Sequence, residues 1–157
     1  MNIRKATVSD VGRMVELSEE KRIEYAEYSP VFWRKADDSA EKQAPFLSYQ
    51  IEQERNIVLV AEADGAIVGF VIASIGDAPP VYNPGGKVCM VDDFTVSEPA
   101  LWPTVGRELV SQAFSEAKSR GAVLLVVCCG RLDEPKRSAL AELGLEIASE
   151  WFVGSIA

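Results

Sequence analysis

The sequence predicts a mixed α/β (α+β) fold in one domain that covers residues 1–157. Apolar strand patterns alternate with amphipathic helix patterns along the whole chain. The Asp64-Gly65 pair marks a hairpin between two strands, because a type I′ turn needs positive φ at both central residues. A strand, a helix and a second strand then follow over 88–129. We therefore expect a central mixed, mostly antiparallel sheet of six to seven strands, flanked by about four helices.

The first elements are a short strand and a capped helix. Residues 2–7 alternate weakly, as a strand does. Thr7 or Ser9 can cap the helix that follows, since a side-chain oxygen there accepts from a free backbone N–H group. Ser29-Pro30 breaks this helix near Tyr28.

A second helix and a hairpin come next. The helix is predicted over about 40–55, with Phe46, Leu47 and Ile51 turned inward. The strands 57–63 and 66–75 flank the turn. Gly76 to Lys87 is a long connection rich in proline and glycine, and connections of that length are often functional or mobile.

The strand over 88–97 should place Met90, Asp92, Phe94 and Val96 on one face, and the intervening residues on the other. A helix over about 103–120 then begins at Pro103, whose missing N–H group would be unpaired there anyway, and Gly121 caps its end. The strand over 122–129 is almost wholly apolar, as expected of a central strand covered on both faces. This crossover should make the two strands parallel.

The last part of the chain is predicted to be a helix and a strand. The helix contains Ala139, Leu140 and Leu143, and Gly144 stops it. The residues over 145–156 alternate, and we expect them to close the sheet as its last strand.

Composition excludes several classes of function. The net charge is −8, which disfavours nucleic acid as a partner and suits a cationic small substrate, although acidity also serves solubility. There is no histidine, and the three cysteines lie inside apolar runs, so no metal site is expected. No apolar run is long enough to cross a membrane, and no signal-peptide pattern is present, so we expect a cytoplasmic protein.

The strand, loop and helix over Cys89 to Val110 have the arrangement that holds a phosphate group, because free N–H groups and the positive end of the helix dipole face the anion together. The spacing from Val96 to Gly106 resembles the cofactor-binding segment of the GNAT superfamily of N-acetyltransferases. That family carries Arg/Gln-x-x-Gly-x-Gly/Ala in this loop. Here Leu101 and Thr104 replace two of those residues, and only Gly106 matches.

The resemblance implies a GNAT fold that uses acetyl-CoA as co-substrate, without a metal. The strands 88–97 and 122–129 would be parallel and would splay apart, and the pantetheine arm would lie between them. The backbone of Phe94, Thr95 and Val96 would pair with the arm. The N–H groups near Thr104, Val105, Gly106 and Arg107 would hold the pyrophosphate, and Arg107 is equally well explained as a solvated helix residue.

The resemblance also suggests where the acceptor binds. In the family, the region between the first two helices walls the acceptor site, so the candidates for substrate contact are Tyr25, Tyr28, Phe32 and Trp33. These aromatic residues are also explained by packing under a loop.

Catalysis of amine acylation needs a base, and Asp92 and Asp93 are the candidates. They resemble the acidic pair before Phe-x-Val in polyamine acetyltransferases, and a structural hydrogen bond is the alternative reading. Because the two side chains point to opposite faces, at most one is catalytic unless a bulge intervenes. The family's proton-donating tyrosine is replaced by Leu140, so Tyr82, Cys129 or water would protonate the leaving thiolate.

We therefore predict an N-acetyltransferase that moves an acetyl group from acetyl-CoA to the primary amine of a small, cationic substrate by direct attack in a ternary complex. The alternative is a non-catalytic GNAT-fold protein that binds acyl-CoA as a sensor or interaction module. The resemblance also allows a homodimer.

Overall fold

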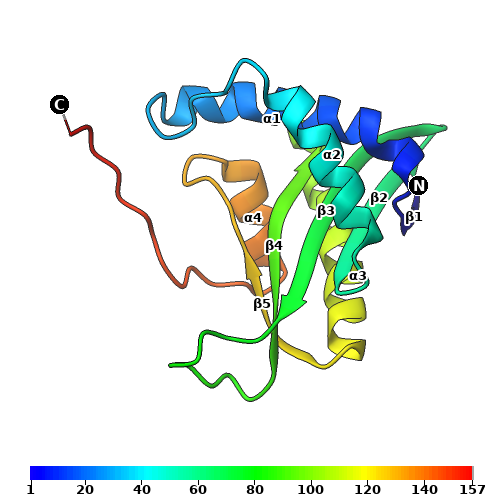
Figure 1. Cartoon of the computed structure of the whole chain (residues 1–157), viewed down its shortest axis with the longest axis vertical. Coiled ribbons are helices and arrows are strands. Elements are labelled where there is room, and N and C mark those ends of the chain that lie inside the picture. Colours follow the sequence, from blue (N-terminus) through cyan, green and yellow to red (C-terminus); the bar gives the residue numbers. More distant parts are fainter. Residues whose placement is uncertain (157) are drawn as a thin grey trace.

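The computed structural model describes residues 1–156, which form one sheet with helices on both faces (Figure 1). The strands are β1 (Asn2–Lys5), β2 (Asn56–Ala63), β3 (Ala66–Gly76), β4 (Lys87–Val96) and β5 (Ala122–Val127). The helices are α1 (Val11–Tyr28), α2 (Ser39–Glu52), α3 (Arg107–Ser119) and α4 (Glu134–Glu142). Three single turns complete the list: η1 (Val8–Asp10), η2 (Pro99–Leu101) and η3 (Trp102–Gly106).

The strands lie in the order β1-β2-β3-β4-β5. The first three pairings are antiparallel, and β4 pairs with β5 in parallel. The sheet thus has five strands among the described residues, fewer than the six to seven expected. The parallel pairing confirms the crossover that the strand-helix-strand unit predicted.

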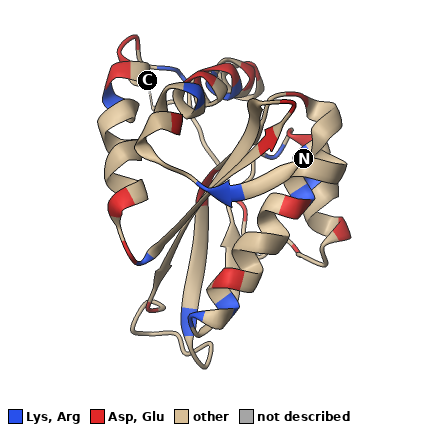
Figure 2. Ribbon diagram, turned by 90° about the vertical axis from the view of Figure 1, so that its right-hand side faces the viewer, with Lys and Arg blue, Asp and Glu red and all other residues tan. Residues whose placement is uncertain are grey.

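Two apolar layers hold the helices to the sheet. One face of β2 and β3 packs under α1 and α2 around Met14, Leu47 and Phe70. The other face packs under α3 and α4 around Val71, Leu109 and Leu140. Figure 2 shows charged residues on the helices and loops, while the strands are mostly uncharged. This distribution is the one that burial of apolar side chains favours.

The turn and helix-end predictions are confirmed. Asp64 and Gly65 have φ of 53° and 78°, as the predicted hairpin turn requires. Gly121 and Gly144 end their helices with φ of 86° and 81°, values that cost a glycine little because it has no Cβ. The first helix ends at Tyr28, also as predicted.

A β-bulge at Asp92 corrects the predicted alternation of β4. Asp93 pairs with Ile72 and Val91 pairs with Ala73, so Asp92 has no partner in β3. Asp93 and Thr95 therefore face α1 and α2, whereas Phe94 and Val96 face α3. The bulge puts Met90 on the face of Asp93 instead of the face of Phe94, because one extra residue reverses the alternation.

Four other expectations were wrong in detail. The first strand stops at Lys5, because Asp10 accepts a hydrogen bond of 2.7 Å from the Thr7 N–H group and turns the chain. Phe46 is exposed, while Leu47 is buried. The strand 122–129 ends at Val127 and has no buried residue in β5, and residues 145–156 form no strand. They leave the body of the protein as an extended tail (Figure 1).

Candidate active site

A wedge opens between β4 and β5. The two strands pair from Lys87 and Ala122 up to Val91 and Val127. The last hydrogen bond between the two segments is donated by the Cys128 N–H group to the Val91 carbonyl, at 3.0 Å. Beyond it, residues 92–96 of β4 have no partner on the β5 side. The predicted splaying of these two strands is therefore confirmed.

The backbone groups of Phe94 and Val96 point into this wedge. The Ser97 N–H group donates to the Val68 carbonyl of the hairpin at 2.8 Å. In an antiparallel pair, residues alternate between facing the partner and facing away. Because the backbone groups of Ser97 face β3, the backbone groups of Val96 and Phe94 face away from β3. A free strand edge is thus available to a ligand that can hydrogen-bond as a strand does.

Lys136 of α4 reaches into the same wedge. Its side chain is buried, with 3% of the residue exposed, and its ammonium donates to the Phe94 carbonyl at 3.1 Å. The ammonium lies 5.0 Å from the centre of the Phe94 ring and 5.5 Å from that of Trp102, within cation–π range. Burial lowers the pKa of Lys136. The lysine therefore occupies one acceptor on the free edge of β4.

Asp133 joins α1 to α4 across the top of the wedge. Its carboxylate is fully buried, accepts a hydrogen bond of 2.8 Å from the Tyr25 hydroxyl, and pairs with the Lys21 ammonium at 2.7 Å. It also caps α4 by accepting from the Lys136 N–H group at 3.3 Å. Three groups thus depend on one carboxylate for their positions.

The four aromatic residues proposed to contact substrate form one cluster at the end of α1. The ring of Tyr25 lies 5.3 Å from Tyr28 and 5.2 Å from Trp33, and Trp33 lies 4.5 Å from Phe32. The Tyr25 hydroxyl also accepts from the Gly130 N–H group at 3.1 Å, which attaches the cluster to the end of β5. Burial raises the pKa of Tyr25, so its hydroxyl keeps its proton.

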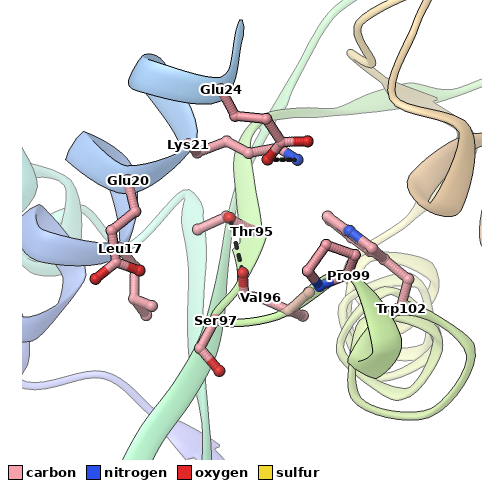
Figure 3. A pocket seen from close by; sticks show the side chains of 9 residues that line it. All are labelled: Leu17, Glu20, Lys21, Glu24, Thr95, Val96, Ser97, Pro99 and Trp102. Atoms are coloured by element: carbon pink, nitrogen blue, oxygen red, sulfur yellow. Dashed lines mark hydrogen bonds and ion pairs between the residues drawn. The ribbon is translucent and has the colours of Figure 1, made fainter.

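A small acidic cavity lies between α1 and the end of β4 (Figure 3). Its volume is about 60 Å³. The carboxylates of Glu20 and Glu24 line it together with the Lys21 ammonium, which pairs with Glu24 at 3.0 Å. The other lining residues are Leu17, Thr95, Val96, Ser97, Pro99 and Trp102. Two carboxylates against one ammonium leave the lining with an excess of negative charge.

The two candidate bases have different surroundings. Asp92 is exposed on the bulge, and its nearest polar partner is the Cys128 thiol, 3.8 Å away. Asp93 is half-buried under α1 and α2 and accepts a hydrogen bond of 3.3 Å from the Gln43 side chain. Burial raises the pKa of Asp93, and the charges of Arg22 and Lys136 oppose that rise. Only Asp93 shares a face of β4 with Thr95, which lines the cavity.

The start of the third helix differs from the open loop that the sequence suggested. Helical turns begin at Pro99, directly after the two residues 97–98. Trp102 is fully buried, and its ring meets the Phe94 ring edge-on at 4.7 Å. Thr104 is exposed, whereas Val105 and Gly106 are buried. Arg107 pairs with Glu142 at 2.7 Å on the surface.

Gly106 is close to the Trp102 ring, and this contact predicts the effect of a substitution. A Cβ at Gly106 would lie 2.4 Å from Cε3 of Trp102. We expect Gly106→Ala to lower the free energy of unfolding by about 1–3 kcal/mol, because the buried indole has to move. Urea denaturation measures the change. Gly12→Ala is the control: Gly12 lies in α1 with nothing within 4 Å of its Cβ position, so alanine should stabilise the helix there. Equal behaviour of the two variants would contradict the account.

Tyr82, one of the candidates for proton donation, lies apart from the wedge. Tyr82 is 72% exposed in the connection 77–86, which joins β3 to the start of β4. Phe94 lies seven residues further along β4, about 23 Å at 3.3 Å per residue. The structure therefore does not bring Tyr82 together with Asp93. Leu140, which replaces the family's tyrosine, is buried in the core under α4.

Sequence reasoning missed four residues of this site. Glu20 and Glu24 were not among the candidates, although their spacing with Leu17 and Lys21 puts all four on one helical face. Lys136 and Asp133 lie in a charged segment after β5. Asp133 directly before Glu134-Pro135 is a capping signal that could have indicated its buried role.

Among residues 1–156, no group of three His, Cys, Asp or Glu side chains is arranged to hold a metal ion. In the same part of the chain, no helix is both long and apolar enough to span a membrane.

Comparison with known proteins agrees with this geometry. Residues 19–144 match the acetyltransferase (GNAT) family. An uncharacterized N-acetyltransferase of Bacillus subtilis (strain 168), YhfO, is 26% identical over 148 residues, which are 93% of this chain and 90% of that protein. The chain therefore belongs to the GNAT acetyltransferase family and is an acyltransferase by that membership.

Solved structures show the same fold at low identity. A mutant of the BH1408 protein of Bacillus halodurans superposes with a TM-score of 0.87 at 16% identity, over 100% of both chains. A predicted acetyltransferase with acetyl-CoA from Clostridium acetobutylicum gives 0.75 at 18% identity, over 99% of this chain and 96% of that one. An aminoglycoside 6′-N-acetyltransferase from Acinetobacter haemolyticus gives 0.72 at 17% identity, over 100% of both.

Proposed function

We propose that this protein transfers an acetyl group from acetyl-CoA to the primary amine of a small, cationic substrate. One observation carries the proposal. Val96 belongs to the free edge of β4 and also to the wall of the acidic cavity, and Thr95 beside it lines the same cavity. A donor held along that edge and an amine held in that cavity would therefore meet at the end of β4.

The cavity suits a protonated amine. Glu20 and Glu24 present their carboxylates to it from successive turns of α1 (Figure 3). Such charged acceptors bind an ammonium group more strongly than neutral ones do. The aromatic cluster of Tyr25, Tyr28, Phe32 and Trp33 lies at the end of the same helix, and its partly exposed rings would contact the remainder of the substrate.

Asp93 is the base that we assign. Its carboxylate lies on the cavity side of β4, two residues before Thr95, a Cα separation of about 7 Å. A bound amine attacks only as the neutral form, so a carboxylate has to take its proton, directly or through a water molecule. The raised pKa of Asp93, caused by burial, makes it a stronger base than an exposed aspartate.

The wedge fits the extended arm of acetyl-CoA. The backbone groups of Phe94 and Val96 are those that a strand-like ligand would pair with, and Lys136 covers only the Phe94 carbonyl. At the start of the third helix, Thr104 and Arg107 are exposed enough to meet a pyrophosphate. When bound, acetyl-CoA supplies the acetyl group as a reactive thioester. The Val96 N–H group would donate to a carbonyl oxygen placed beside it.

Protonation of the leaving thiolate has two candidates in this site. Cys129 follows β5 at the side of the wedge, and burial raises the pKa of its thiol to about 11, so the thiol holds its proton at neutral pH. Water is the second candidate. A Cys129→Ala variant, which has no proton to donate, would assign the role to water if it kept the wild-type rate.

Two measurements test the proposal. Thermal melting with acetyl-CoA should show stabilisation of about 2.7 kcal/mol when the ligand is present at a hundred times its dissociation constant. Thiol release should then appear with cationic primary amines, such as diamines and amino sugars, and should be weaker with neutral amines. Absence of both effects would overturn the proposal.

Removal of the cavity's negative charge should weaken amine binding. We expect Glu20→Gln and Glu24→Gln each to raise KM for a cationic amine about tenfold, since one charge-assisted hydrogen bond contributes about 1.5 kcal/mol or more. Steady-state kinetics at saturating acetyl-CoA measures this change. Glu16→Gln is the matched control, because Glu16 is exposed on the same helix outside the cavity. An unchanged KM in both cavity variants would remove the carboxylates from substrate binding.

Leu140 favours a second function, an acyl-CoA-binding protein without transferase activity. Its buried side chain has no proton to donate where the family carries a tyrosine. In that case, thermal stabilisation by acetyl-CoA would occur, and thiol release would be absent with every amine.

A further inference from the structure

A buried glutamine, Gln43, connects α2 with α1 and with β4. Only 5% of this residue is exposed, and both polar atoms of its side chain have partners. The amide nitrogen donates to the Ser18 hydroxyl at 3.0 Å and to the Asp93 carboxylate at 3.3 Å. The amide oxygen accepts from the Arg22 guanidinium. Because a buried amide is unfavourable without hydrogen bonds, these contacts hold Gln43 in one place.

The neighbours of Gln43 also fix the direction of its amide. A guanidinium only donates hydrogen bonds, and an ionised carboxylate only accepts them. Arg22 therefore requires the amide oxygen, and Asp93 requires the amide nitrogen. Arg22 is itself held by the Glu19 carboxylate, 2.9 Å away. Rotation of the amide by 180° would lose both bonds, so its N–H group stays directed at Asp93.

We propose that Gln43 is a positioning residue for the reaction and acts through Asp93. This role rests on the proposed function, in which Asp93 is the base. Gln43 binds Oδ2 of Asp93, which leaves Oδ1 to take the proton of the amine or of a water molecule. The residues that line the acidic cavity do not include Gln43. Its effect on the amine is therefore indirect, through the orientation of the carboxylate.

The same hydrogen bond affects how readily Asp93 takes a proton. Burial raises the pKa of Asp93, and the charge of Asp92 acts in the same direction. The charges of Arg22 on α1 and Lys136 on α4 lower this pKa, as does the hydrogen bond from Gln43. A donor stabilises the ionised carboxylate more than the protonated one. Removal of the amide should therefore raise the pKa of Asp93 further and move the acidic limb of the rate profile to higher pH.

Gln43→Met tests this role, because methionine keeps the length of the side chain but has no N–H group to donate. We expect kcat to fall about 10- to 100-fold at a pH above the acidic limb of both proteins, since a small displacement of a reacting group has an effect of this size. KM for the amine should stay nearly the same, and the acidic limb should move to higher pH. Gln53→Met at the end of α2 is the matched control, because its amide donates to the Tyr49 carbonyl at 3.3 Å. It should keep the wild-type kcat and pH profile.

Gln43→Glu provides a second test that keeps the contact with Arg22. The new carboxylate would repel the charge of Asp93, so the acidic limb should move to higher pH by more than in Gln43→Met. Circular dichroism and thermal melting verify that each variant is folded. If Gln43→Met does not fold, the pH profile of Gln43→Glu still decides the question.

Two results would overturn the inference while the proposed function stands. One is a Gln43→Met variant with the kcat and the acidic limb of wild type, when Asp93→Asn is inactive. The other is a fall in kcat without any movement of the acidic limb in either variant, because a purely structural role would have that effect. Wild-type activity in Asp93→Asn would instead remove Asp93 as the base, and the role of Gln43 with it.

Discussion

Asp93→Asn is expected to lower kcat/KM for amine acetylation about 100- to 10,000-fold, the range that a positioned general base contributes. Only the ionised carboxylate accepts a proton, and burial raises the pKa of Asp93 above its ordinary value of 3.8. The wild-type rate should therefore fall as the pH decreases through that raised pKa. The variant should lack this acidic limb. Rate profiles over pH measure both effects, and Asp92→Asn, on the exposed bulge, is the matched control with a small expected change.

Asp93→Asn should lower the activity but raise the stability at neutral pH. This combination distinguishes a catalytic role of Asp93 from a structural one. Because the folded state binds the Asp93 proton more tightly than the unfolded state, ionisation of Asp93 destabilises the fold. The difference in stability between wild type and Asp93→Asn should develop as the pH rises from 3.8 through the raised pKa of Asp93, and it should be complete above that pKa. Asp93→Asn should thus be more stable than wild type at neutral pH and equal to it in acid. A variant that is both inactive and unstable at neutral pH would indicate a structural role.

Asp133→Ala is expected to lower the free energy of unfolding by about 3–5 kcal/mol, the usual cost of removing one partner of a buried ion pair. The substitution removes the acceptor of Lys21 at 2.7 Å and of Tyr25 at 2.8 Å, together with the cap of α4. Urea denaturation followed by circular dichroism measures the change.

Two further variants calibrate this prediction. Asp133→Asn keeps an oxygen for the cap and removes the charge, so its effect should be intermediate. Glu142→Ala breaks the exposed pair with Arg107 at 2.7 Å and should change stability by less than about 1 kcal/mol. If Asp133→Ala and Glu142→Ala had similar small effects, the buried carboxylate would not be the link between α1 and α4.

The parts of the fold that follow from local rules were predictable. Asp64-Gly65 requires one kind of turn, and Gly121 and Gly144 end helices because φ is positive there. The parallel pairing of β4 with β5 follows from the helical crossover between them, and the length from Val96 to Gly106 indicated the wedge at their ends.

The remainder depends on contacts between distant residues. The bulge at Asp92 is set by the register with β3, which the alternation of one strand does not contain. The tail over 145–156 has the pattern of a strand, yet a pattern does not supply a partner strand, and the tail forms no strand. Lys136 was not a candidate, because Lys is rarely buried unless it finds a partner, and its partner is a backbone carbonyl 42 residues away.

A crystal structure with coenzyme A tests the central claim most directly. Our account predicts that the pantetheine arm lies between β4 and β5, with hydrogen bonds to the backbone of Phe94 and Val96. The Lys136 ammonium should then have left the Phe94 carbonyl, and the sulfur should lie beside the cavity lined by Glu20 and Glu24. Coenzyme A bound at another place, with Lys136 still on Phe94, would contradict the account.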